Sequence, residues 1–165
     1  MRARSQRPAA RAPGGPGASG VGLREQVVLK TSIERAYAFV ADPTNDPSWW
    51  RGVKAVRPVE GMERTYDQVT TLLGMRFTAR IAVVATDPPN QATLASVDSR
   101  VPFVATYLFE DLGDRGTFFT LDGNVAVVGP YRVIAPVFLP VLRRLTRRYL
   151  GKLAAILDET PVATL

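Results

Sequence analysis

The sequence contains no cysteine and no histidine among its 165 residues. The absence of cysteine excludes disulfides, zinc–thiolate sites and cysteine nucleophiles. The absence of histidine excludes Ser-His-Asp catalysis and the iron site built from two histidines and a carboxylate. No dense group of aspartates favours a magnesium or calcium site. We therefore expect no metal and no cofactor, and any acid–base chemistry falls to Asp, Glu, Tyr, Lys or Arg.

Acidic residues are missing from positions 1–23, which hold four of the 21 Lys and Arg residues. The other 17 basic residues face 15 acidic ones, so most of the net charge of +6 lies in this segment. Its many Pro, Gly and Ala residues predict a disordered tail, either a solvated extension or a tether to anionic lipid or nucleic acid. It has neither the apolar core of a secretion signal nor a twin-arginine pair, so we expect a cytoplasmic protein.

Residues 24–165 are long enough for one domain with its own core. Their first part, residues 27–53, predicts a strand and then two short helices. Thr31 and Glu34 have the spacing of a capping box at the start of the first helix. The apolar face of that helix consists of Ile33, Ala36, Tyr37 and Val40. Pro43 ends it, and Asp46 is expected to cap a second helical turn that closes at two adjacent tryptophans.

Past the tryptophans, strands alternate with tight turns, and no helical pattern separates one strand from the next. The expected strands cover residues 53–59, 66–73, 76–86, 91–97, 102–111 and 117–128. The strongest turn signals are Asp87-Pro88-Pro89-Asn90 and the glycine-bounded stretch 113–116. This arrangement predicts an antiparallel meander.

The final helix is expected to begin near Pro136. Its predicted apolar stripe consists of Phe138, Leu142, Leu145, Tyr149, Leu153 and Ile156. The opposite half carries Arg143, Arg144, Arg147, Arg148 and Lys152. The apolar run 133–142 is too short and too rich in proline to span a membrane. The basic half is either a solvated surface or a face that docks on anionic lipid; no nucleic-acid partner is expected, because no nucleic-acid-binding signature is present.

The stretch S-I-E-R-A-Y-A-F-V-A-D-P-T-N-D-P-S-W-W resembles the opening of the START-like superfamily, whose bacterial members are called SRPBCC or polyketide cyclase/dehydrase-like proteins. The resemblance covers about residues 24–159. It implies an α+β helix-grip fold: a curved antiparallel sheet wrapped around a long C-terminal helix, with two short helices after the first strand and a cavity between sheet and helix. It implies less about function, since the superfamily includes lipid carriers, hormone receptors, cyclases and oxygenase domains.

Alternation along the expected strands separates an inward from an outward face. The predicted cavity lining consists of Trp50, Phe77, Ile81, Phe103, Ala105, Tyr107, Phe109, Phe119, Leu121, Phe138, Leu142, Leu145 and Tyr149. The same side chains would also make an ordinary core, and both interpretations stand. Tyr107 is the best-placed candidate for acid–base catalysis, against an ordinary buried tyrosine. Arg76 and Arg80 lie on the outward face, either solvated or gripping a carboxylate ligand.

Two functions are therefore open. The first is a non-catalytic binder or carrier of an apolar small molecule such as a lipid, polyketide, isoprenoid or aromatic compound, which the apolar lining favours. The second is a polyketide cyclase or dehydratase acting in the same cavity, which rests on the family resemblance. A membrane-surface or protein-binding role for the basic helix is a weaker third. No feature predicts a particular oligomeric state.

Overall fold

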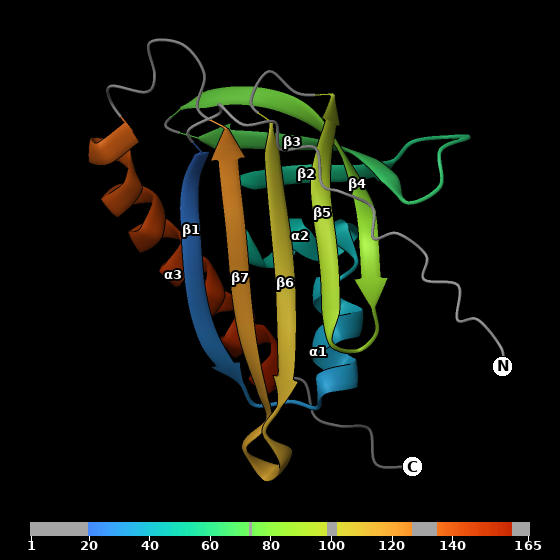
Figure 1. Ribbon diagram of the computed structural model, residues 1–165, viewed down its shortest axis with the longest axis vertical. Helices are drawn as coiled ribbons and strands as arrows, with labels where there is room; N and C mark the ends of the chain where they lie inside the picture. The colour runs from blue at the N-terminus through green and yellow to red at the C-terminus, as the bar shows by residue number, and fades with distance from the viewer. Residues whose placement is uncertain (1–19, 73, 99–101, 127–134, 160–165) are drawn as a thin grey trace, which may run out of the picture.

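Seven strands form one antiparallel sheet in the structure, a computed structural model that describes residues 20–72, 74–98, 102–126 and 135–159. The strands are β1 (Gly20–Leu29), β2 (Val53–Pro58), β3 (Thr65–Leu72), β4 (Met75–Asp87), β5 (Gln91–Asp98), β6 (Phe103–Asp111) and β7 (Thr117–Ala126). Their order across the sheet is β1-β7-β6-β5-β4-β3-β2 (Figure 1). The first strand thus pairs with the last, and the others form the predicted meander.

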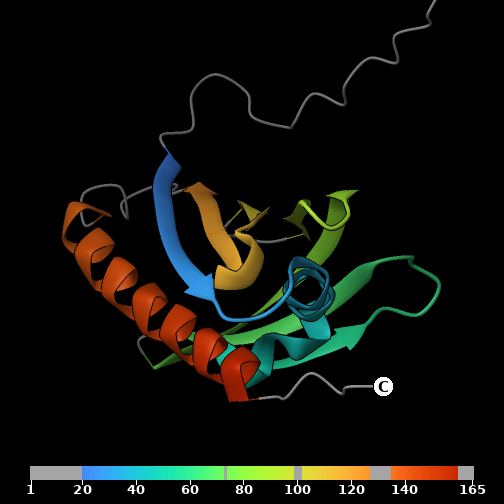
Figure 2. The ribbon, with the colours of Figure 1, turned by 90° about the horizontal axis from the view of Figure 1, so that it is seen from below.

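The helices complete the predicted helix-grip architecture. They are α1 (Ile33–Val40), η1 (Pro43–Asn45), α2 (Asp46–Trp49), η2 (Gly113–Arg115) and α3 (Ala135–Glu159). Figure 2 shows the sheet curving around α1, with α3 lying along its open side next to β1. β1 begins at Gly20 and pairs with β7 from that residue on, so residues 20–23 belong to the sheet and not to the predicted tail. The rest of that tail lies outside the described residues.

The predicted cap of α1 is wrong by one residue. The hydroxyl of Ser32, not of Thr31, accepts the backbone N–H of Arg35 at 3.4 Å. Thr31 is still part of the turn that leaves β1, because its own N–H donates to the carbonyl of Leu29 at 2.9 Å. That turn buries the Thr31 side chain against the sheet, where it cannot reach the end of the helix.

The buried face of α3 is rotated from the predicted stripe. The buried positions among the described side chains of α3 are Thr146, Leu150, Leu153 and Leu157. Of the predicted stripe, only Leu153 is among them, and Leu142, Leu145, Tyr149 and Ile156 are half-buried. The helix packs beside β1 and against α2, which places its contact line about one residue further along the chain. The side chain of Phe138 lies outside the described part of the chain.

An ion pair ties α3 to β1. The Nε atom of Arg147 donates to Oε2 of Glu25 at 2.7 Å. Glu25 is buried on the inward face of β1, whereas the Arg147 side chain stays 70% exposed. Arg147 is therefore not simply part of the solvated basic face, because it neutralises the one buried carboxylate of β1.

Replacing Arg147 by glutamate should lower the free energy of unfolding by about 1–2 kcal/mol. The substitution removes a hydrogen bond to a charged group and sets a second carboxylate beside the buried Glu25. The exposure of Arg147 keeps the effect below that of a fully buried pair. Urea denaturation measures it, with Arg148→Glu on the exposed side of the same turn as the control. Equal losses in the two variants would show that the ion pair contributes nothing.

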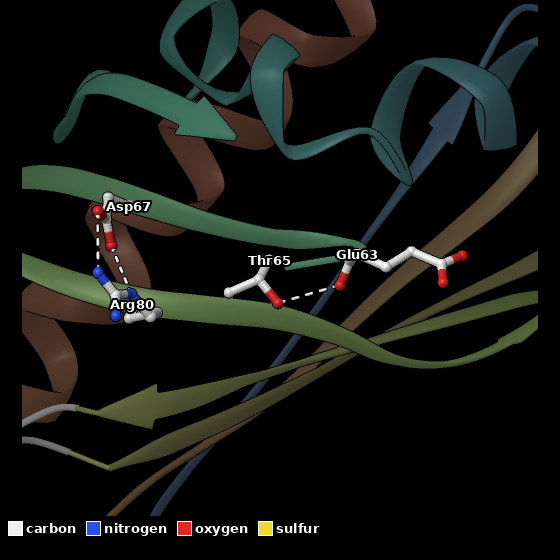
Figure 3. Close-up of polar contacts among 4 residues, drawn as sticks. All are labelled: Glu63, Thr65, Asp67 and Arg80. Atoms are coloured by element: carbon white, nitrogen blue, oxygen red, sulfur yellow. Dashed lines mark hydrogen bonds and ion pairs between the residues drawn. The ribbon is translucent and has the colours of Figure 1, made fainter. Parts of the chain in front are cut away.

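The convex face of the sheet carries a second ion pair, on β3 and β4. Arg80 donates to both carboxylate oxygens of Asp67, from Nε at 2.8 Å and from Nη2 at 3.2 Å (Figure 3). The two residues are directly opposite in the strand register. The hydrogen bond from Arg80 lowers the pKa of Asp67. Arg80 is therefore neither free in solvent nor directed at a ligand on the concave side.

Candidate functional site

The inward side chains of β6 become progressively more buried along the strand. Phe103 at its start is half-buried, Ala105 is 9% exposed, and Tyr107 and Phe109 are each 3% exposed. Ala105, Tyr107 and Phe109 belong to the buried core and Phe103 packs against it, and α1 contacts this strand. The concave face is thus tightly packed at the end of β6 and looser at its beginning.

The packed end is an aromatic cluster. The ring centroids of Phe109 and Phe119 are 5.1 Å apart, and Tyr37 of α1 meets Phe109 edge-on at 5.5 Å. Tyr107 contacts Phe119 from the other side at 5.8 Å. Phe109, Phe119, Leu121 and Ile81 are all at most 3% exposed. These four predicted lining residues therefore form the core beneath the site.

The loosely packed end lies where β6 and α3 begin, toward the top of Figure 1. Leu142 and Leu145 of α3 are half-buried there, and Val141 is 47% exposed. β4 shows the same gradient, since Phe77 near its start is 43% exposed and Ile81 is buried. Phe77 is accordingly at the rim of the concave face and not within its lining.

A notch interrupts the aromatic side chains of the sheet at Ala105. In the strand register Ala105 lies opposite Gly123 of β7, so two adjacent inward positions carry almost no side chain. A Cβ atom built on Gly123 would meet only the Leu23 carbonyl oxygen, at 3.8 Å. The notch lies between Phe103 and Tyr107, at the transition from the loose to the packed end.

Trp50 and Tyr149 form an aromatic contact between α2 and α3. Their ring centroids are 5.9 Å apart, which links the end of α2 to the middle of α3. Trp50 also packs on Trp49, with centroids 5.2 Å apart. Trp49 is fully buried, whereas Trp50 and Tyr149 remain half-buried although they pack against the core. Both residues were predicted to line the site, and their role as lining stays a prediction.

Asp46 is the main candidate site residue that the sequence did not predict as one. Asp46 was predicted to cap α2, but Asn45 occupies the cap position and makes no side-chain cap bond. Asp46 is instead the first residue of the helix, 3% exposed, and its Oδ1 atom has no hydrogen-bond partner. A cap and a buried acid look the same in the sequence, since D-P begins a helix in either case. Only the side-chain direction, set by the fold, separates the two.

The Asp46 carboxyl interacts with two further polar groups, the indole of Trp49 one turn along α2 and, through its charge, the phenol of Tyr107. Burial raises the pKa of the Asp46 carboxyl well above its ordinary value, and the negative charge of Asp42 adds to the rise, whereas the Trp49 side chain acts in the opposite direction. Despite that proximity, the Trp49 Nε1–H group makes no hydrogen bond of good geometry. Burial likewise raises the pKa of Tyr107, and the charge of Asp46 contributes to this rise. This environment therefore favours the neutral forms of the Asp46 carboxyl and the Tyr107 phenol.

A depression of about 670 Å³ lies along α3. Its lining consists of Leu139, Pro140, Arg143, Arg144, Arg147 and Arg148. All of these described residues belong to α3, and Arg147 among them pairs with Glu25 of β1.

No group of three or more His, Cys, Asp or Glu side chains in the described ranges is arranged to hold a metal ion. None of the helices in the same ranges has the length and hydropathy needed to cross a membrane.

Comparison with family models gives one match, which covers residues 21–159. The family is described as polyketide cyclase/dehydrase and lipid transport. A comparison with curated proteins gives no match.

Solved structures share the fold at low sequence identity. A conserved protein from Geobacillus kaustophilus has a TM-score of 0.71 at 18% identity, over 84% of this chain and 96% of that one. A protein from Thermus thermophilus has a TM-score of 0.69 at 15% identity, over 84% of this chain and 97% of that one. StfQ, a di-domain ARO/CYC protein of the steffimycin biosynthetic pathway, has a TM-score of 0.68 at 14% identity, over 85% of this chain. The matched part is only 51% of StfQ.

Proposed function

The chain belongs to the polyketide cyclase/dehydrase and lipid transport family, and from that premise we propose that it binds an apolar small molecule between the concave face of the sheet and α3. The ligand is a lipid, polyketide, isoprenoid or aromatic compound. The site extends from the half-buried side chains Phe103, Leu142 and Leu145 to the notch at Ala105, with Trp50 and Tyr149 at its side.

The main support for this proposal is that β4, β6 and α3 all become less tightly packed toward the same end of the molecule. Inward side chains of β4, β6 and α3 are buried at one end and half-buried or exposed at the other. A folded chain normally buries such apolar surface, and large exposed apolar patches commonly mark binding sites. A ligand that fills this end would complete the core which the side chains leave open.

The chemistry of the lining favours an apolar ligand. The side chains that surround the notch are aromatic or aliphatic, and the one buried carboxylate of β1 is already paired with Arg147. An ionised ligand group placed among them would lose its hydration without gaining a counter-charge. We therefore expect hydrocarbon or aromatic ring to occupy most of the site.

A titration with an apolar fluorescent probe tests the proposal. We expect saturable binding at roughly micromolar strength, about −8 kcal/mol, with one probe per chain. Mass spectrometry of an organic extract of the purified protein should then show a small molecule of the same class. A probe signal that never saturates, together with an extract free of small molecules, would contradict the proposal.

A cyclase or dehydratase acting on a polyketide is the second candidate. The observation in its favour is the buried Asp46 carboxyl, whose raised pKa suits a general acid and whose charge adds to the rise in the pKa of Tyr107. StfQ and BexL, both ARO/CYC proteins of biosynthetic pathways, share the fold. If Tyr107→Phe or Asp46→Asn abolished turnover of a polyketide while binding persisted, the enzyme would be favoured over the carrier.

A further inference from the structure

Basic charge within residues 24–165 is concentrated on α3. Residues 135–157 hold five Arg and Lys residues and no acid, whereas residues 24–134 hold 12 basic and 13 acidic residues. Arg147 is already paired with Glu25. The other four basic residues are exposed and make no ion pair within the described parts of the chain: Arg143, Arg144, Arg148 and Lys152. The helix therefore presents a cationic surface on a domain that is otherwise close to neutral.

The same surface carries exposed apolar side chains near the start of α3. Val141 is 47% exposed, and Pro140 beside it is exposed too. Spacings of three, four and four residues place one row on a single side of the helix: Val141, Arg144, Arg148 and Lys152. The depression along α3 likewise brings Leu139 and Pro140 together with arginines. Helices that bind at membrane surfaces combine these two kinds of side chain.

The apolar start of α3 lies at the same end of the molecule as the start of β1 (Figure 1). The two elements run side by side in the same direction, because Glu25 pairs with Arg147 and a second contact follows further along both. There the backbone N–H of Lys30 donates to the Asp158 carboxylate at 3.0 Å. Residues 1–19, which hold four arginines and no acid, directly precede β1 in the sequence. More basic charge thus joins the chain at this end.

We propose that residues 139–152 of α3 dock this end of the protein on an anionic lipid bilayer. Pro140 and Val141 enter the interfacial layer, and the unpaired basic residues contact lipid phosphates. Each basic residue near such a surface raises the affinity about fivefold. A bilayer fits better than a nucleic acid, because a phosphate backbone would bind the arginines but offers no apolar layer for Val141. Docking does not depend on a bound ligand, so it can fail separately from the proposed function.

Flotation of the full chain with lipid vesicles tests the proposal. The protein should float with vesicles of equal parts phosphatidylglycerol and phosphatidylcholine, and pure phosphatidylcholine should bind it far more weakly. The double variant Arg144→Gln/Arg148→Gln should lose about 25-fold in affinity for the anionic vesicles. Lys30→Gln/Arg115→Gln removes the same charge from exposed positions at the other end of the molecule and should bind as the wild type does. Equal affinities of the two double variants would overturn the proposal.

An uncharged substitution tests the apolar part of the surface. Val141→Ser should weaken binding to the anionic vesicles about fourfold, since less apolar surface enters the interface. Val28→Ser is the matched control, because Val28 is 45% exposed near the far end of β1. Unchanged binding of Val141→Ser would contradict insertion of this end of α3.

A DNA duplex distinguishes the bilayer from a nucleic acid. Added to the vesicles at the same concentration of phosphate, it should leave most of the protein bound to lipid. Displacement of most of the protein by the duplex would assign the basic surface to nucleic acid and overturn the proposal.

Discussion

Leu153→Arg should leave the chain unfolded. Leu153 has no exposed surface and lies in the middle of the buried face of α3, between Leu150 and Leu157. An arginine there would place an unpaired charge in the core, at a cost of several kcal/mol, comparable to the ~5–15 kcal/mol that stabilises an ordinary domain. Circular dichroism and the soluble fraction after expression measure the effect.

Ala155→Arg is the matched control for that substitution. It introduces the same side chain two residues further along the same helix, at an exposed position. The control should fold as the wild type does. Similar behaviour of the two variants would contradict the orientation of α3.

Ala105→Trp should abolish binding of an apolar ligand while the protein stays folded. The notch formed by Ala105 and Gly123 is the place where the lining has room, and an indole would fill it without introducing charge. Probe titration should show affinity reduced by at least about 100-fold, since a ligand cannot occupy filled space. Val104→Trp, on the outward face of the same strand, should bind as the wild type does.

A second variant keeps that prediction testable if Ala105→Trp does not fold. Gly123→Val reaches the same notch from β7, where an added Cβ meets no close neighbour. It should weaken binding less than the tryptophan does, because it fills less of the space. A folded variant of either kind that binds the probe with wild-type affinity would show that the ligand lies elsewhere.

Much of the architecture was predictable because local signals and the fold agree. The turn at Pro88-Pro89, the alternation along β4 and β6 and the break at Pro43 each indicated their element correctly. The order of the strands follows from the same logic except for β1. β1 is the first strand of the chain and pairs with β7, the last strand. No local sequence pattern predicts a pairing between strands so far apart in the chain.

The burial and contacts of individual side chains were less predictable, and the physical reason differs from residue to residue. Asp46 was interpreted as a cap because D-P begins helices, but the approach of β6 with Tyr107 buries the carboxyl. Leu145 was placed mid-stripe by its spacing, yet α3 packs beside β1 and leaves it half-buried. In the sequence, Arg147 cannot be told apart from the other arginines of the basic face, and only the fold places it against Glu25. In each case the deciding partner is remote in the sequence.

Contact quenching of tryptophan fluorescence by a brominated apolar compound tests the central claim most directly. The chain has two tryptophans, and Trp49 and Trp50 both lie at the proposed site. Bromine quenches only at short range, so emission reports contact between ligand and indole. We predict a saturable loss of emission whose midpoint matches displacement of the fluorescent probe, with most of the loss removed in Trp50→Phe. Displacement of the probe with unchanged tryptophan emission would contradict the claim that the ligand lies between the concave face and α3.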